Sequence, residues 1–235
     1  MRPQLLFRKI HRWLGLILGL QILLWFLSGF FMSWMPIEQV RGSHLWQPAQ
    51  SSPLPAVTID GAKVQAAIPE SVQSMVVKTW LQRPVIEATT AHGTWLLDAQ
   101  NHALITPLNE QQARAVVAER LRPPLQILAV QWLDEVPAEA RGRQAPLWQV
   151  QLSGPENPRV YVSPSTGDIV ATRTDRWRWF DFLWMLHIMD YDEREDFNHP
   201  LLYLTAGSAL LFTLSGVVLL VFSFRNRQRR RQATS

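Results

Sequence analysis

The stretch Trp13–Met35, WLGLILGLQILLWFLSGFFMSWM, decides the architecture because it carries no formal charge from end to end. An α-helix rises about 1.5 Å per residue and the hydrocarbon core of a bilayer is about 30 Å thick, so about 20 apolar residues span it. A cleaved signal peptide would have an apolar core of roughly 7–15 residues followed by a small-residue cleavage site. Trp13–Met35 is longer and lacks such a site, so we predict an uncleaved transmembrane helix over residues 13–35.

A second uncharged stretch lies near the C-terminus. It is Pro200–Phe224, with the sequence PLLYLTAGSALLFTLSGVVLLVFSF. A proline suits the first turn of a helix, where its missing N–H has no intrahelical partner to lose. Residues 199–224 are therefore predicted to form a second transmembrane helix, antiparallel to the first, and the two helices form a hairpin in the lipid bilayer.

Basic residues flank this hairpin at both chain ends. Residues 1–35 and 199–235 contain nine Lys and Arg and no acid, whereas all 19 Asp and Glu lie between them, so the net charge of +4 divides into +9 and −5. The positive-inside rule places residues 1–12 and the basic tail 225–235 in the cytoplasm and the intervening domain in the periplasm of a bacterial inner membrane. An acidic folded domain argues against a nucleic-acid partner. The absence of cysteine excludes disulfides and covalent c-type haem.

The segment 36–175 is predicted to be an α+β domain, with a linker at Ser51–Pro55 near its start. Helices are expected at 60–68 and 110–121, and strands at 75–81, 85–90, 94–98, 103–108, 125–133, 147–152, 159–163 and 169–172. The strand at 94–98 and its following turn and strand align with those beginning at 159, which indicates a tandem repeat of one helix-plus-sheet unit. Residues 176–198 are expected to form an aromatic interfacial helix, too short to span the membrane, and then an acidic connector.

Three of the six histidines, His11, His187 and His199, lie at the predicted membrane boundaries, while His44, His92 and His102 are expected at the surface of the domain. A neutral imidazole near a helix end is the usual axial ligand of b-type haem, which needs no cysteine.

Two glycines support the haem interpretation at His11. Gly15 and Gly19 follow His11 by four and eight residues, so they share its helix face and leave a smooth groove for a flat macrocycle. The alternative is that the same glycines permit close contact between helices.

The positions of the histidines constrain how an iron could be held. His11 lies at the cytoplasmic end of the hairpin, and His187 and His199 lie at the opposite end, so one chain cannot clamp one iron between His11 and His199. Two copies of His11, from a homodimer or a heteromeric membrane partner, would be needed, and a dimer provides four helices. A competing hypothesis is a mononuclear metal site formed by His187, Asp190, Asp192 and His199.

Three segments resemble the PepSY-associated transmembrane (PepSY_TM) family. They are KIHRWLGLILGLQILLWFLSGFF at 9–31, RVYVSPSTGDIVATRTDRWRWFDFLWMLHIMD at 159–190, and LTAGSALLFTLSGVVLLVFSF at 204–224. The resemblance implies an inner-membrane protein with tandem PepSY-like modules outside, related to larger siderophore-iron reductases that carry b haems between four or more helices. On the matching motifs, it implies His11 and His187 as haem ligands and His199 as a weaker third, although two spans fall short of a complete bundle.

Two functions follow as hypotheses. In the first, haem near each membrane face passes electrons to a periplasmic acceptor such as a ferric chelate, and a quinol or a partner supplies them, since the chain has no G-x-G-x-x-G nucleotide motif. In the second, the chain is a haem-free membrane-anchored PepSY module that binds or regulates a periplasmic or membrane partner. A hydrolase is disfavoured because no nucleophile elbow or Ser-His-Asp arrangement stands out.

Overall fold

The computed structural model describes residues 3–48 and 56–232, so the predicted linker at Ser51–Pro55 lies outside the described residues. The chain divides into two compact units. We call Met1–Met35 with Trp179–Ser235 the helical unit and Pro36–Arg178 the sheet unit. The fold is α+β, as the sequence predicts.

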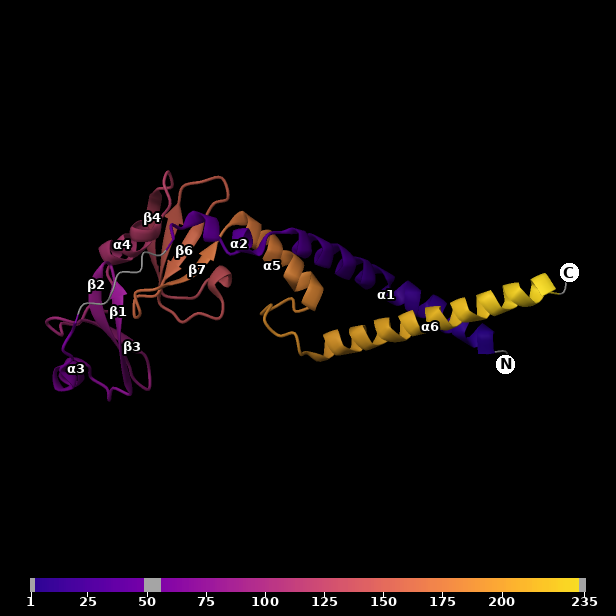
Figure 1. Cartoon of the computed structure of the whole chain (residues 1–235), viewed down its shortest axis with the longest axis horizontal. Helices are drawn as coiled ribbons and strands as arrows, with labels where there is room; N and C mark the ends of the chain where they lie inside the picture. The colour runs from indigo at the N-terminus through magenta and orange to yellow at the C-terminus, as the bar shows by residue number, and fades with distance from the viewer. Residues whose placement is uncertain (1–2, 49–55, 233–235) are drawn as a thin grey trace. The chain divides into compact units, whose positions relative to one another are not determined.

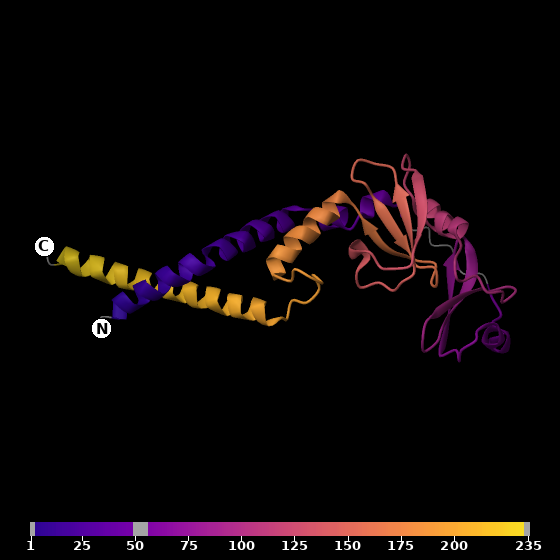
Figure 2. The same ribbon diagram turned by 180° about the vertical axis from the view of Figure 1, so that it is seen from behind.

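The helical unit consists of two long antiparallel helices and the end of a third. They are α1 (Pro3–Trp34), α6 (Pro200–Gln232) and α5 (Asp175–Ile188), which begins in the sheet unit and enters the helical unit at Trp179. α1 and α6 run side by side, and the first turns of α1 lie at the same end as the last turns of α6 (Figures 1 and 2). By length and composition, Leu5–Trp34 and Pro200–Arg225 can each cross a membrane, with a hydropathy of 2.1.

α1 begins ten residues before the predicted span. Arg8, Lys9 and Arg12 therefore lie within the helix rather than before it. Long basic side chains can follow the apolar surface and place their charge at the membrane boundary, so they do not end a helix. Pro3 is the first helical residue, a position that proline favours.

The sheet unit contains two antiparallel sheets, each preceded by a helix. The first repeat is α3 (Gly61–Ala67), β1 (Ser74–Trp80), β2 (Arg83–Thr89) and β3 (Thr94–Asp98). The second is α4 (Glu110–Arg120), β4 (Ile127–Leu133), β5 (Leu147–Leu152), β6 (Arg159–Val162) and β7 (Ile169–Arg173). Short helices complete the unit at α2 (Ile37–Val40), η1 (Ser43–Leu45) and η2 (Ala138–Ala140). Helix and sheet thus occur twice in the same order, as the tandem repeat predicts.

Helix starts follow local side-chain chemistry. The side chain of Asp60 accepts hydrogen bonds from the backbone N–H groups of Ala62 and Lys63 at the start of α3. Asn109 and Gln112 form a capping box at the start of α4, each side chain accepting from the backbone of the other. Both helices begin within one residue of their predicted positions.

The predicted strand at 103–108 is wrong. Of these residues, all of which the structure describes, only Leu104 makes a ladder bridge, to Leu97. The backbone N–H of Leu96 donates instead to the side-chain oxygen of Thr106, at 3.0 Å. Pro107 has no N–H to donate, so the ladder cannot continue. The first sheet therefore has three strands and the second has four.

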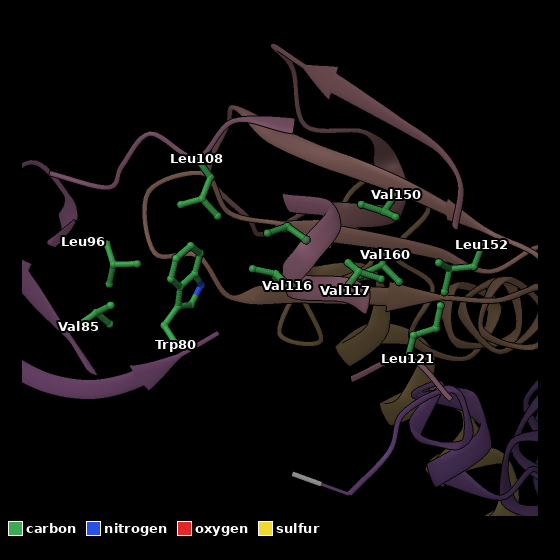
Figure 3. Packing of buried hydrophobic residues seen from close by; sticks show 11 residues of the cluster. Trp80, Val85, Leu96, Leu108, Val116, Val117, Leu121, Val150, Leu152 and Val160 are labelled. Atoms are coloured by element: carbon green, nitrogen blue, oxygen red, sulfur yellow. The ribbon is translucent and has the colours of Figure 1, made fainter. Parts of the chain in front are cut away.

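One hydrophobic core joins the two repeats. Trp80, at the end of β1, lies between Val85 and Leu96 of the first sheet and the α4 residues Val116 and Val117 (Figure 3). On the other side of α4, the core continues into β5 and β6 through Val150, Leu152, Val160 and Val162. The sheet unit is therefore one folded body rather than two independent modules.

Trp80 also makes a polar contact between the repeats. Its indole Nε1 donates a hydrogen bond to the carbonyl oxygen of Gly167, at 3.0 Å, in the turn between β6 and β7. Gly167 has a φ of +70°, and a Cβ on it would lie 2.5 Å from the same Nε1 atom. Only glycine fits this turn without displacing the indole.

Candidate functional site

His11 of α1 docks on α6. Its ring stacks on Phe212, with centroids 4.3 Å apart and planes inclined by 7°. Its Nδ1 lies 2.8 Å from Oγ of Ser215 and 3.2 Å from the carbonyl oxygen of Phe212. A Cβ added at Gly216 would lie 3.0 Å from Cε1 of His11, so the glycine leaves room for the ring.

His187 of α5 docks on α1 in a matching way. Its Nδ1 lies 3.0 Å from Oγ of Ser28. A Cβ added at Gly29 would lie 3.4 Å from Cε1 of His187. Each transmembrane candidate thus carries a Leu-Ser-Gly sequence, at 27–29 and 214–216, that receives an imidazole from another helix. We call these the Ser28 cradle and the Ser215 cradle.

The hydrogen bonds fix which nitrogen carries the proton. Oγ of Ser215 donates its one proton to the carbonyl of Phe212, at 2.7 Å, and Oγ of Ser28 donates to the carbonyl of Leu24, at 2.7 Å. The carbonyl of Phe212 can only accept, so Nδ1 of His11 is the protonated nitrogen. While Ser28 donates to the carbonyl of Leu24, its oxygen can accept from Nδ1 of His187 in the same way.

The other ring nitrogen of each histidine is left with a lone pair. No described residue forms a hydrogen bond with Nε2 of His11 or of His187. A neutral imidazole that donates through Nδ1 and presents a bare Nε2 is the form in which histidine binds metals. In both cradles, Nε2 is thus the ring nitrogen that the described residues leave without a hydrogen bond.

The two cradles are separate sites. Ser28 contacts His187, and His11 lies 17 residues earlier on the same helix α1. At about 1.5 Å per residue, this places them about 25 Å apart. One iron cannot bind both histidines of one chain, which agrees with the constraint drawn from the sequence.

His199 differs from the other two candidates. Its Nε2 donates to the carbonyl oxygen of Ile188, at 2.9 Å, so this nitrogen is protonated and engaged. The competing mononuclear site is not formed: among the residues that the structure describes, no group of three or more His, Cys, Asp or Glu is placed to hold a metal ion. That finding includes His187, Asp190, Asp192 and His199.

The glycines that follow His11 have different surroundings. A Cβ on Gly15 would lie 2.9 Å from Cε2 of Phe212, so Gly15 permits close contact between α1 and α6. A Cβ on Gly19 would have no described atom within 4 Å. Phe212 thus covers the helix face next to His11 that the sequence suggested for a macrocycle, and only the surface around Gly19 remains open within one chain.

An apolar cavity of about 350 Å³ adjoins the Ser28 cradle. Trp25, Phe26, His187, Ile188 and Leu202 line it. The acidic connector holds α5 in place beside it, because Arg194 pairs with the buried carboxylate of Asp181 and its carbonyl accepts from Trp184. His187 therefore lies beside an apolar cavity, on a helix whose C-terminal half is held by the connector.

The sheet unit contains a larger cavity, of about 610 Å³. Trp95, Pro107, Leu147 and Val170 supply apolar surface, and Arg143, Ser163, Ser165, Thr166, Glu70 and His92 supply polar groups. His92 pairs with Glu70, at 3.1 Å, and its side chain is 81% exposed. Elsewhere in the unit, His102 accepts a hydrogen bond at Nε2 from the backbone of Asp60.

A buried ionic cluster lies at the start of α5. The carboxylate of Glu139 accepts from Arg178 at 2.6 and 3.1 Å, from Arg159 at 3.3 Å and from the hydroxyl of Tyr161 at 3.2 Å. Burial alone would raise the pKa of Glu139, but the hydrogen bonds and charges of these arginines lower it below 4.5. Burial and the charge of Glu139 raise the pKa of Tyr161 to about 12. The cluster fixes the first turn of α5, up to Arg178, within the sheet unit.

Comparison with known proteins identifies the family. The sequence pattern described as the PepSY-associated TM region, PepSY_TM, matches residues 8–235. The chain belongs to this family. No curated protein and no solved structure matches the chain. Membership, with the hydropathy of α1 and α6, makes this a membrane protein with two transmembrane helices and a PepSY sheet unit.

Three residues that contact the imidazoles cannot be identified by selecting histidines in the sequence. They are Ser28, Ser215 and Phe212, which contact imidazoles 159–204 residues away in sequence. The signal that could have found them is the Leu-Ser-Gly sequence, which occurs once in each span. A serine that is buried in an apolar helix needs a partner for its remaining lone pairs or must bond its own backbone.

Proposed function

We propose that this PepSY_TM protein binds b-type haem at the two cradles and serves in electron transfer across a bacterial inner membrane. The observation that carries the proposal is the pair of histidines whose Nδ1–H groups are held and whose Nε2 atoms are bare. Nε2 is the nitrogen that binds haem iron when Nδ1–H is engaged.

The residues around the Ser28 cradle suit the group, whereas at the Ser215 cradle Phe212 covers the adjacent face of α1 and haem would have to lie on another side of His11. His11 and His187 would supply nitrogen ligands to the iron, and the cavity beside His187 is lined by apolar and aromatic side chains. When bound, haem supplies one-electron transfer between the ferric and ferrous states. Ser28 and Ser215 orient the imidazoles, and Phe212 holds one face of His11.

We propose that the chain works as a dimer or with a homologous membrane partner. Among the described residues, one chain offers a single bare Nε2 at each cradle, so a second histidine ligand would come from another subunit. Two hairpins provide four helices, the usual number in bundles that hold cofactors. Two such sites, about 25 Å apart along α1, would lie near opposite faces of the membrane.

The proposed orientation has both termini in the cytoplasm and the sheet unit in the periplasm, since the basic residues flank the hairpin at its chain ends. A reporter enzyme that is active only in the cytoplasm, fused after Ser235, is expected to be active, and the same reporter inserted at an exposed loop such as Gly142 is expected to be inactive. Activity reversed between the two positions would contradict the orientation and the assignment of cradles to membrane faces.

The haem proposal has a direct spectroscopic test. Full-length protein purified in detergent from cells supplied with haem precursors is expected to show a Soret band and reducible b-type bands. A dimer is expected to contain two haems, one at the paired Ser28 cradles and one at the paired Ser215 cradles. Pyridine extraction should release the haem, because the chain has no cysteine for a covalent link. A colourless preparation from haem-replete cells would reject the proposal.

A second candidate function is a haem-free anchored module that binds a partner through the sheet unit. The 610 Å³ cavity favours it, because its apolar lining with convergent hydroxyls and one arginine is typical of a site for a peptide or small molecule. The colourless outcome of the spectroscopic test would support this candidate. A ferric chelate is the acceptor only under the first proposal.

A further inference from the structure

We propose that Ser28 and Ser215 are positioning residues that set the tautomer and the donor strength of His187 and His11. The tautomer part stands on the hydrogen bonds of this structure alone. The donor-strength part rests on the proposed haem function, because it concerns how strongly each Nε2 binds iron.

The arrangement is reciprocal between the helices. The serine of α1 receives a histidine from α5, and the serine of α6 receives a histidine from α1. Each serine is almost fully buried, with 1% exposure for Ser28 and 5% for Ser215. A buried hydroxyl that merely satisfied itself would need only its bond to the preceding turn, which both serines already make. The imidazole contact is therefore additional to what helix formation requires.

The glycine after each serine makes this contact possible. Any side chain at Gly216 would place its Cβ 3.0 Å from Cε1 of His11, closer than carbon atoms normally approach. Gly29 leaves slightly more room for His187, at 3.4 Å. Serine and glycine thus act together: the serine holds Nδ1–H, and the glycine leaves room for the ring at Cε1.

The two cradles are not equivalent. His11 has a second acceptor, the carbonyl oxygen of Phe212, at 3.2 Å, and it also stacks on the Phe212 ring. For His187 the acceptor on α1 is Ser28, at 3.0 Å. Removal of the hydroxyl is therefore expected to release His187 more completely than His11.

A held Nδ1–H strengthens Nε2 as a ligand. As Nδ1–H donates to an acceptor, electron density shifts toward Nε2, which favours the ferric over the ferrous iron. Loss of the acceptor is expected to weaken metal binding by about 10-fold to 100-fold. A tenfold loss confined to the ferric state raises a one-electron potential by 59 mV.

The first test uses no cofactor. Nitrogen-15 NMR of haem-free, histidine-labelled full-length protein in detergent distinguishes protonated from bare ring nitrogens. In wild type, His11 and His187 are expected in the Nδ1–H form. In Ser28→Ala, the ratio of the Nδ1–H to the Nε2–H form of His187 is expected to fall about fivefold, which corresponds to one neutral hydrogen bond. Ser215→Ala should shift His11 less.

Matched controls remove a hydroxyl that bonds only its own helix. Ser33 donates to the carbonyl of Phe30 on α1, and Thr213 donates to the carbonyl of Ala209 on α6. Ser33→Ala and Thr213→Val are expected to leave both tautomers unchanged. An unchanged tautomer in Ser28→Ala, or an equal change in Ser33→Ala, would overturn the inference.

The second test uses haem-loaded protein. Redox titration of Ser28→Ala and Ser215→Ala is expected to show an upward shift in one of the two midpoint potentials each, larger for Ser28→Ala, with the control variants unshifted. Ser28→Thr, which keeps the hydroxyl, should have a midpoint potential close to the wild-type value. If wild type binds haem and neither potential moves, the inference fails while the proposed function stands. If wild type binds no haem, the proposed function fails and the NMR result still decides the role of the serines.

Discussion

His11→Ala is expected to abolish haem binding at the Ser215 cradle and to leave binding at the Ser28 cradle intact. His187→Ala is expected to do the reverse. The reason is the distance of about 25 Å between the cradles, which share no side chain. Because an axial ligand is lost outright, each variant should retain about half of the wild-type haem per chain, measured by pyridine extraction against protein concentration. The remaining haem should titrate with a single midpoint potential.

His92→Ala is the matched control for these variants. His92 lies in the sheet unit with its side chain 81% exposed and pairs with Glu70 on the surface. Its loss should change neither haem content nor potential. Added imidazole should restore binding in His11→Ala, since it replaces the missing nitrogen. Loss of all haem in both variants would mean that one iron depends on both histidines, and retention of all haem would show that the ligands are other residues.

The helices and most strands could be predicted because their signals are local. The capping residue Asn109 and the short runs of apolar and β-branched residues, such as Val160–Val162 of β6, lie within the elements that they define. The strand predicted at 103–108 failed where one polar side chain decided the outcome. Thr106 takes the hydrogen bond that a strand residue would have made, and nothing in the apolar pattern of Ala103–Leu108 reports this.

Part of the candidate site could likewise be predicted from the sequence, and part could not. His11 and His187 could be selected from their positions at predicted membrane boundaries. For Gly15 the sequence left two interpretations open, a groove for a macrocycle or close helix contact, and the structure favours the second because α1 and α6 meet at this face. Ser28 and Ser215 were missed because their imidazole partners come from other helices. Contacts between segments that are far apart in the sequence leave no periodic pattern in either segment.

The last prediction concerns the core that the two repeats of the sheet unit share. Trp80→Ala is expected to destabilise the sheet unit by about 3–5 kcal/mol, the usual cost of removing a large buried aromatic side chain. Trp80 is 5% exposed and also bonds the carbonyl of Gly167 across the repeats. Pulse proteolysis of full-length protein in urea would measure the midpoint, with an m value taken from wild type.

Two further variants separate the contributions of Trp80. Trp80→Phe keeps most of the ring but loses the hydrogen bond to Gly167, so about 1 kcal/mol is expected. Trp132, which is 37% exposed and packs edge-on against Trp148, is the matched control, and Trp132→Ala should cost no more than about 1.5 kcal/mol. Hydrogen exchange should accelerate in both sheets of Trp80→Ala, because the core residues around Trp80 belong to both repeats. Acceleration confined to β1–β3 would show that the repeats fold independently, and the single core would then be the wrong description of this unit.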